Sequence, residues 1–290
     1  MAAFVFTYAS LNILLGTLLY FLLHKEVKET DILGFSCVYS IVVTPCILYF
    51  LRVLNFDNGI NFFVILGSLL VLCVHKWIRK KLIFLKADAI FLDDKAMLLI
   101  VCVICLLFVN EGLLTGAAYR NDIGDMAKSY GTIIATAGSK GLYIEHPFAV
   151  GNRMYYYFFY YFKAAEIIKI LGGTCTFKVL TWIIFLDGIM ISFSVIFLLH
   201  KIGTFFGLNQ KYITFISAIL IADGGFDCLW MIFENKNEIG GGYIDGWVRV
   251  VYEGLAVTAH SNYFIKLLWQ PQHVSAVIPF LLFLYLLFRI

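Results

Sequence analysis

Charged residues are scarce in this chain of 290 residues. They make up 14% of it, whereas hydrophobic residues make up 61% and the mean hydropathy is +0.88. A soluble globular domain is closer to half apolar and a quarter charged. A single soluble core cannot hide so many apolar side chains, so lipid must cover much of the surface. The composition therefore predicts an integral membrane protein and excludes an ordinary soluble domain.

Three further properties find no support in the sequence: nucleic-acid binding, a signal peptide, and a redox or metal site at Cys-x-x-Cys. No basic stripe interleaves with aromatic residues in a water-facing segment, so the sequence gives no support for nucleic-acid binding. The first residues, MAAFVFTYAS, lack a positively charged start and a clear cleavage site, which predicts a retained helix rather than a signal peptide. The Cys-x-x-Cys at Cys102 and Cys105 lies inside an apolar run, which favours small apolar filler over a redox or metal site.

Long apolar runs are what the chain has in abundance. A helix needs roughly 20 apolar residues to cross a hydrocarbon core about 30 Å thick. Several runs approach this length, and we expect an all-α, multi-pass membrane protein with about seven transmembrane helices. The runs are 3–23, 32–53, 60–74, 96–109, 179–199, 212–233 and 274–290.

Lysine and arginine set the predicted orientation, because they concentrate in short cytoplasmic loops. The loop between the third and fourth runs carries Lys76, Arg79, Lys80, Lys81, Lys86 and Lys95. We therefore expect this loop inside the cell, the N-terminus outside, and two long exterior loops at 111–152 and 234–272. Residue usage compatible with an AT-rich bacterial genome indicates a bacterial plasma membrane.

The predicted organisation has two parts and no separate soluble domain. Residues 1–95 form an N-terminal three-span segment, and residues 96–290 form a second membrane region that contains both exterior loops. The last apolar run continues to residue 290. We expect from this that the sequence is an N-terminal fragment of a longer protein.

Segment 154–171, MYYYFFYYFKAAEIIKIL, combines many aromatic residues with Lys163, Glu166 and Lys169. Tyrosine-rich amphipathic helices suit the headgroup level, so we expect a juxtamembrane helix that lies flat at the interface. The alternative is a membrane-crossing helix whose lysines reach toward water. Only the flat helix would place Lys201 on the cytoplasmic side.

Carboxylates are concentrated at the start of the first exterior loop, in RNDIGDMAKSYGTI. Asp122 and Asp125 are three residues apart and would share one face of a short helix. Ionisable residues at a membrane face are costly, so they mark function by default. N-capping and compensation of the helix dipole are the competing account of the pair. Asp187, inside an apolar run, is predicted to be a buried hydrogen-bonding partner between helices, with a proton-path group as the alternative.

An exterior aspartate, a His-Pro about twenty residues later, a juxtamembrane helix and a further span together resemble the GT-C superfamily of membrane glycosyltransferases. Asp125 and His146-Pro147 carry this resemblance, which is closest in pattern to protein O-mannosyltransferases and lipid A aminoarabinose transferases. It covers 96–199 well and 212–290 in outline. The chain departs from the pattern in having Gly-Asp-Met where Asp-Glu is common, a single proline, and three spans before the loop instead of one.

The resemblance implies an inverting glycosyltransferase of hexosyltransferase type. It would move a sugar from a polyprenyl-phosphate donor to an acceptor hydroxyl on the exterior face. The acceptor hydroxyl needs a general base, and a carboxylate in a partly dry pocket can have its pKa raised into a useful range. Asp125 is our first candidate for this base and Asp122 is the second.

The departing lipid phosphate needs positive charge or hydrogen-bond donors, and the sugar needs polar and aromatic contacts. The predicted substrate-binding residues are Arg120, Lys128, His146, Arg249, Trp269 and His273. Each has a structural alternative. The basic residues could be ordinary charges at the membrane interface, and His146 could simply donate a hydrogen bond to a loop carbonyl. Trp269 and His273 could belong to the aromatic belt at the membrane surface.

A divalent cation is a further option, since some members of the resembled superfamily use one. Mg²⁺ and Mn²⁺ prefer oxygen ligands, which Asp122, Asp125, Asp223 and Asp227 could supply. These aspartates lack the tight spacing of a ligand set, so no metal ligand is assigned.

Two functions from other classes compete with the enzyme. A transporter or flippase for a lipid-linked saccharide or small solute would place charged residues near the midplane and often show duplicated halves. The sequence has one mid-span carboxylate and no visible duplication, and this favours the enzyme. A scaffold subunit without chemistry would leave the activity of a complex unchanged when Asp122 and Asp125 are replaced by asparagine.

Overall fold

The computed structural model of the chain is mostly helical in the residues that it describes, as the composition predicts. The described residues are 2–54, 60–79, 83–85, 123–141, 143–154, 159–170, 176–209, 211–215 and 275–289. Helices long and apolar enough to cross a membrane are Phe4–Leu23, Glu29–Val53 and Phe185–Phe205. Shorter apolar helices cover Phe63–Ile78 and Val277–Phe288. These helices indicate a membrane protein. The predicted run 96–109, and residues 216–233 of the predicted run 212–233, lie outside the described residues.

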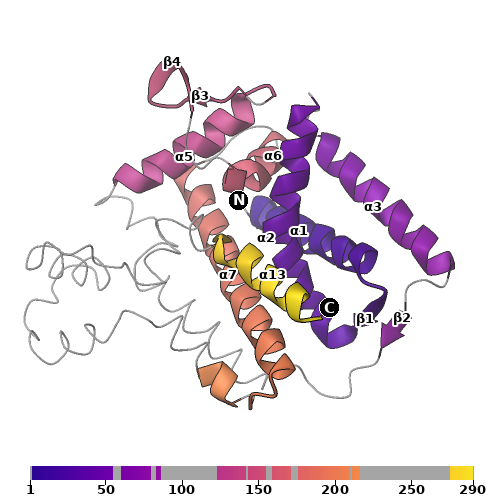
Figure 1. Cartoon of the computed structure of the whole chain (residues 1–290). Coiled ribbons are helices and arrows are strands. Elements are labelled where there is room, and N and C mark those ends of the chain that lie inside the picture. Colours follow the sequence, from indigo (N-terminus) through magenta and orange to yellow (C-terminus); the bar gives the residue numbers. More distant parts are fainter. Residues whose placement is uncertain are drawn as a thin grey trace, which may run out of the picture.

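The helices of the bundle come from both ends of the chain (Figure 1). They are α1 (Ala2–Leu23), α2 (Ile32–Val53), α3 (Ile60–Ile78), α7 (Phe177–Phe205) and α13 (Val277–Arg289). Strand β1 (Glu26–Lys28) and the 3-10 turn η1 (Glu29–Asp31) join α1 to α2, and β1 pairs in parallel with β2 (Ile83–Leu85).

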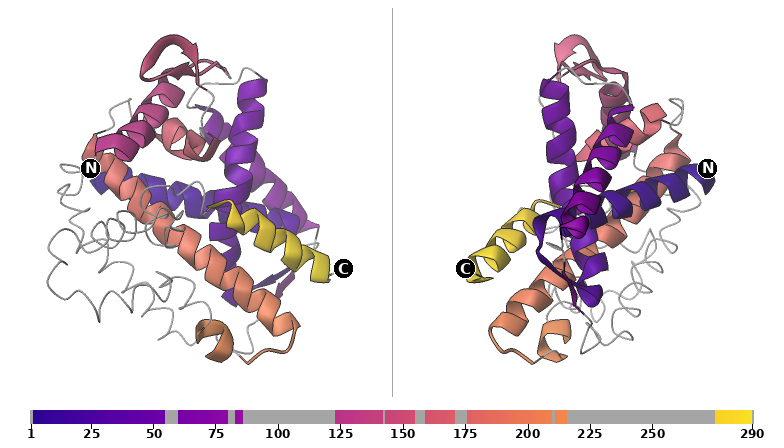
Figure 2. Two further views of the ribbon diagram at one scale, coloured as in Figure 1. Left: turned by 60° about the vertical axis from the view of Figure 1, so that its left-hand side comes forward. Right: turned by 90° about the vertical axis from the view of Figure 1, so that its right-hand side faces the viewer.

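The remaining described elements form a layer across one end of this bundle (Figures 1 and 2). They are α5 (Ile123–Gly138), the hairpin strands β3 (Glu145–His146) and β4 (Ala149–Arg153), the 3-10 turn η3 (Phe159–Tyr161) and α6 (Phe162–Ile170). We call this the hairpin end of the molecule.

Helix α7 has a capping residue at its start and a left-handed glycine just after its end. The Thr176 hydroxyl accepts a hydrogen bond from the Val179 N–H at 3.3 Å, which caps the first turn. At the other end Gly207 adopts φ +69°, a left-handed conformation that glycine takes without strain, and the next N–H, of Leu208, returns to the Gly203 carbonyl. The sequence around these two positions therefore fixes the length of the helix.

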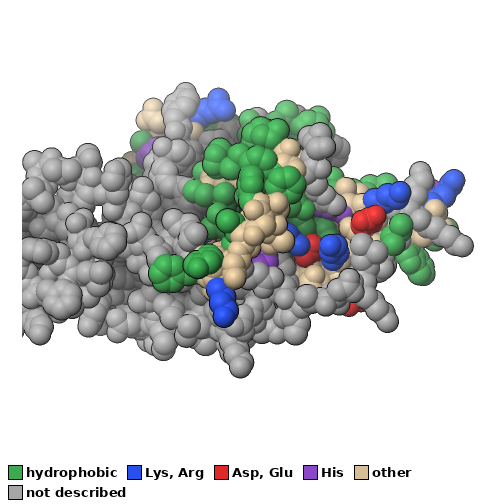
Figure 3. Space-filling model, turned by 60° about the horizontal axis from the view of Figure 1, so that its bottom comes forward, with side chains coloured by type: hydrophobic (Ala, Val, Ile, Leu, Met, Phe, Trp, Pro, Cys, Tyr) green, Lys and Arg blue, Asp and Glu red, His purple; other side chains and the backbone are tan. Residues whose placement is uncertain are grey.

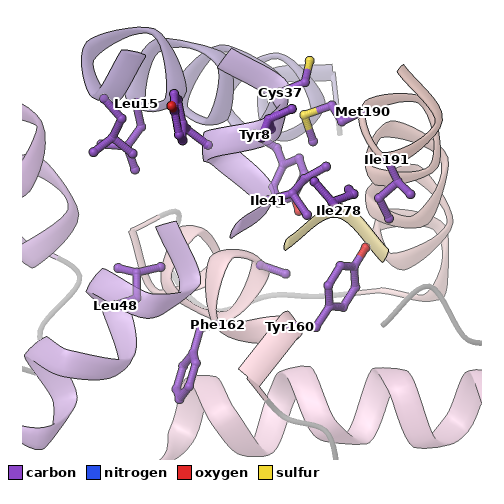
Figure 4. Close-up of a cluster of buried hydrophobic side chains, with 14 of the residues drawn as sticks. Tyr8, Leu15, Cys37, Ile41, Leu48, Tyr160, Phe162, Met190, Ile191 and Ile278 are labelled. Carbon is purple, nitrogen blue, oxygen red and sulfur yellow. The ribbon is translucent and has the colours of Figure 1, made fainter. Parts of the chain in front are cut away.

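Two glycines let the helices of the bundle approach closely. A Cβ on Gly16 of α1 would lie 1.9 Å from the Ser36 carbonyl oxygen of α2, and one on Gly34 would lie 2.2 Å from the Phe197 ring of α7. Small residues at helix contacts are common in membrane proteins, because close backbone approach replaces the hydrophobic driving force there. Buried side chains from α1, α2, η3, α7 and α13 meet in one core (Figure 4).

The end of the bundle away from the hairpin is basic. Lys76 of α3 donates hydrogen bonds to the carbonyl oxygens of Phe21, Leu22 and His24, and Lys201 of α7 pairs with Asp31 at 2.6 Å. Figure 3 brings this face forward and shows lysine and arginine side chains beside a hydrophobic area. We call it the basic end, and define it by Lys25, Lys28, Lys76, Arg79 and Lys201.

The position of Lys201 distinguishes between the two interpretations of segment 154–171. Because α7 ends beside Asp31, Lys201 lies at the same end as Lys25 and Lys28. This is the arrangement expected when the aromatic segment does not cross the membrane. Helix α6 has nine residues, about 14 Å of rise, which is too short to cross by itself.

The environment of α6 adds a buried, protein-facing side to the predicted juxtamembrane helix. Residues 162–168 are buried, and Lys163 and Glu166 are 0% and 2% exposed. Their charges face the protein interior instead of water, because Asp187 and Arg52 provide buried partners for them. The amphipathic pattern therefore marks contact with the bundle and not only with the membrane surface.

Candidate functional site

Most of the predicted site residues lie outside the described residues: Asp122, Arg120, Arg249, Trp269 and His273. The same is true of Asp223 and Asp227. Asp125 and Lys128 are placed by their backbone in the first two turns of α5, and their side chains lie outside the description. We predict that Asp122 and Asp125 share one pocket with Trp269 and His273, and this stays a prediction because these side chains lie outside the described residues. His146 is the predicted site residue whose surroundings are described in full.

Pro147 and Phe148 form the turn of the β3–β4 hairpin, and His146 is the last residue of β3 before it. The Phe148 N–H donates to Nδ1 of His146 at 3.2 Å, and the Met154 N–H donates to the Ile144 carbonyl at 2.8 Å to close the hairpin. An Nδ1 that accepts a hydrogen bond leaves the proton of a neutral imidazole on Nε2. The His146 ring therefore satisfies the Phe148 N–H, whereas the alternative considered from the sequence was a hydrogen bond to a loop carbonyl.

The hairpin rests on α5 at a glycine. A Cβ on Gly131 would lie 3.0 Å from Cβ of Pro147 and 3.2 Å from Cζ of Phe148, which is tighter than ordinary contact. Glycine at this helix position is therefore what lets the His-Pro turn seat on the helix. Asp125 precedes Gly131 by six residues, which is about 9 Å along a helix axis. The backbone of the predicted base and the His-Pro turn thus belong to one local unit.

A groove of about 980 Å³ lies between α5 and the hairpin. Its apolar walls include Tyr130, Ile134 and Tyr143, and its polar groups include Lys140 and His146. Glu145 also lines it, and its carboxylate accepts a hydrogen bond from the Gly151 N–H at 2.7 Å, which leaves the shape of the hairpin fixed. The groove can hold a partly apolar ligand with a polar or anionic group near Lys140.

Arg52, in the last turn of α2, holds this unit onto the bundle. Its guanidinium donates to Glu166 Oε1 of α6 at 2.8 and 3.1 Å, and to the Thr136 carbonyl at 2.7 Å and Ser139 Oγ at 2.9 Å. The side chain is buried and its Cζ lies 4.9 Å above the Phe162 ring. Positive charge at the C-terminus of α5 complements the carbonyls left unpaired there.

A second buried charge cluster surrounds Asp187 of α7. Its carboxylate accepts hydrogen bonds from the hydroxyls of Tyr8 at 2.9 Å and Tyr160 at 2.7 Å, and it pairs with Lys163 Nζ at 3.3 Å. These partners come from α1, η3 and α6. Asp187 is therefore the hydrogen-bonding partner between helices that the sequence predicts. Burial raises the pKa of the Tyr160 phenol well above its usual value, and the Asp187 carboxylate raises it further, so the phenol stays a donor.

The sequence interpretation missed Arg52 and its partner Glu166. A signal was present, because Arg52 is a charged residue at the end of the apolar run 32–53 and such a residue needs a partner. What the sequence could not supply was the partner, which lies 114 residues away.

Among the residues that the structure describes, no three His, Cys, Asp or Glu side chains gather in a way that could hold a metal ion. The four aspartates considered as ligands for Mg²⁺ or Mn²⁺ are not part of that description at the side-chain level. The cation therefore stays an untested prediction.

Comparisons with known proteins do not identify the chain. No family model matches it, no curated protein matches it, and no solved structure matches its fold. The function has to be argued from the residues and their placement.

Proposed function

We propose that the protein is a membrane glycosyltransferase that moves a sugar from a polyprenyl-phosphate donor to an acceptor hydroxyl. The observation that carries the proposal is the unit formed by α5 and the hairpin, in which the His-Pro turn seats on the helix that begins two residues before Asp125. His146 stands directly before this turn, with its Nδ1 accepting the Phe148 N–H, and the groove beside it combines apolar walls with Lys140. These are the groups that a lipid phosphate and a hydroxyl acceptor require.

In this proposal the chain has about seven transmembrane helices in a bacterial plasma membrane. The five apolar helices α1, α2, α3, α7 and α13 supply most of them, and the runs 96–109 and 212–233 supply the rest. The basic end faces the cytoplasm, because lysine and arginine collect there, and the hairpin end faces the exterior. Asp125 acts as the base, with Asp122 as its neighbour and second candidate.

The test is transfer of radiolabelled sugar from membrane lipid donors by cells that express wild type, Asp125→Asn or Asp122→Asn. The Asn variants keep the shape of the side chain and remove its basicity, so loss of transfer at equal protein abundance in the membrane would assign the base. Undiminished transfer by both variants and by the double variant would remove the proposed chemistry. His146→Gln, tested beside them, separates loss of the base from loss of acceptor orientation.

A transporter or flippase is the second candidate, and one observation favours it. Arg52, Lys163, Glu166 and Asp187 place four charged side chains inside the protein, more than the single mid-span carboxylate visible in the sequence. Buried ionisable residues often line transport pathways. Each of these four is ion-paired, however. Arg52, Lys163 and Glu166 lie at the hairpin end, as expected of groups that join elements together. Net flux of labelled lipid-linked saccharide without transfer to an acceptor would favour the transporter.

A further inference from the structure

The β3–β4 hairpin exposes large apolar side chains in a segment that the predicted topology places on the exterior side of the membrane. Tyr143 is 55% exposed, Phe148 is 61% exposed and Val150 is 91% exposed. The Phe148 ring lies edge-on to the His146 ring, with centroids 6.0 Å apart, so it is held at the turn. Contiguous exposed apolar groups on an ordered element mark an interaction surface.

The hairpin begins level with the last lipid-facing turn of α2. Arg52 in that turn donates to Ser139 Oγ at 2.9 Å and to the Gly141 carbonyl at 3.5 Å, which holds residues 139–141 within reach of its side chain. The same turn exposes Phe50, Val53 and Leu54, which are 61%, 45% and 49% exposed. In a helix that spans a membrane, such side chains face lipid.

The hairpin therefore stands where hydrocarbon gives way to headgroups. Figures 1 and 2 agree that it lies at the end of the bundle where α2 ends. Lys140 at the base of the hairpin is exposed, and the nearby acidic side chain, Glu145, is hydrogen-bonded to Gly151 within the hairpin. Exposed apolar side chains beside a long basic one match a surface that is hydrocarbon below and anionic above.

We propose that the β3–β4 hairpin inserts into the exterior headgroup layer of the membrane, with Phe148 and Val150 entering the acyl boundary and Lys140 contacting lipid phosphate. This inference requires that α2 spans the bilayer, and it holds whether or not the protein transfers sugars. It has one consequence for the proposed function. The groove beside His146 would open at the lipid surface, so a ligand with a lipid tail would reach it from the plane of the membrane.

The experiment places an environment-sensitive fluorophore on Val150→Cys. The full-length protein, with its native cysteines replaced, is reconstituted in nanodiscs of phosphatidylcholine and phosphatidylglycerol. Quenching is compared between lipids with a nitroxide near the headgroup, lipids with a nitroxide near the chain end, and aqueous iodide. Val150 is almost fully exposed, so its replacement removes little packing, and Tyr143→Cys provides a second position.

We expect blue-shifted emission and strong quenching by the nitroxide near the headgroup, with weak quenching by iodide, because an interfacial segment sits about 5–10 Å below the surface. Phe148→Ser in the labelled protein should weaken the lipid quenching. Strong iodide quenching without lipid quenching would overturn the inference, since the hairpin would then stand in water. Protection from both quenchers would also overturn it, because a protein surface would then cover the hairpin. A probe on Asn209→Cys, which is exposed in the turn after α7 at the basic end, is the control: its quenching is compared with that at position 150.

Discussion

Arg52 and Glu166 lie 114 residues apart in the chain, yet Nε and Nη2 of the arginine both donate to one carboxylate oxygen, Oε1, at 3.1 and 2.8 Å. Their side chains are 1% and 3% exposed. The same guanidinium also binds the Thr136 carbonyl near the end of α5. This arginine therefore joins the end of α2 to both α5 and α6, and through them to the groove.

Arg52→Ala should destabilise the protein by about 3–5 kcal/mol, because it leaves the buried Glu166 carboxylate without its main partner. Thermal unfolding in detergent, followed by a thiol-reactive dye at the buried cysteines, would measure the loss. Arg52→Lys keeps the charge but cannot form the forked contact, so it should fall between wild type and alanine. Equal melting temperatures for all three proteins would contradict the role given to Arg52.

The Asp187 cluster should behave as a coupled unit. Asp187→Asn removes a buried negative charge and leaves Lys163 unpaired, so it should destabilise strongly, whereas Asp187→Asn with Lys163→Met removes both charges and should recover part of the loss. The measurement is a double-mutant cycle from thermal unfolding of the four proteins. Additive effects would show that the two side chains do not interact as the 3.3 Å distance indicates.

Tyr8→Phe and Tyr160→Phe test the hydrogen bonds to the same carboxylate. Each change removes one hydroxyl donor to Asp187 and keeps the ring, so each should cost about 1–3 kcal/mol, because part of a buried carboxylate is left unsatisfied. The Tyr212→Phe variant is a suitable control, because Tyr212 is 67% exposed. Melting temperatures for both cluster variants that match the control would contradict the hydrogen bonds.

Two glycines offer a matched test of helix packing. Gly16→Ala should be destabilising by about 1–3 kcal/mol, since its new methyl group would meet the Ser36 backbone, which cannot move aside without shifting α2. Gly67→Ala in α3 is the control: its Cβ meets nothing within 4 Å, and alanine favours a helix more than glycine does. Similar melting temperatures for both variants would show that α1 and α2 do not pack as closely as described.

The sequence predicted the mostly helical fold and its long apolar helices, because hydropathy depends on composition and order alone. The number of spans and their orientation stay predictions. The sequence also predicted that Asp187 would be a buried partner between helices, since a lone carboxylate in an apolar run has few other stable environments. It did not predict that the side chains of α6 would be buried, because Lys163 and Glu166 are charged and charged side chains are expected to face water unless they have buried partners. Those partners, Asp187 and Arg52, are distant in the chain, and tertiary contacts of this kind leave no local pattern.

The candidate site was predictable only in its local parts. The sequence singles out His146-Pro147 through the resemblance, and Pro147 does lie in a turn, but its packing against Gly131 follows from a contact between residues sixteen positions apart. The catalytic assignment to Asp125 depends on a resemblance and on chemistry that the described residues do not test.

Sidedness can be tested with single cysteines at the two ends of the bundle. Lys140 lies at the hairpin end and Lys25 at the basic end, and both side chains are exposed, so Lys140→Cys and Lys25→Cys should leave the fold intact. A membrane-impermeant maleimide added to intact cells should label position 140, because positive charge keeps the basic end in the cytoplasm. Position 25 should be labelled only after the cells are opened. Labelling of position 25 in intact cells, with position 140 protected until lysis, would invert the topology. The groove and the proposed base would then face the cytoplasm, where the proposed exterior transfer cannot take place.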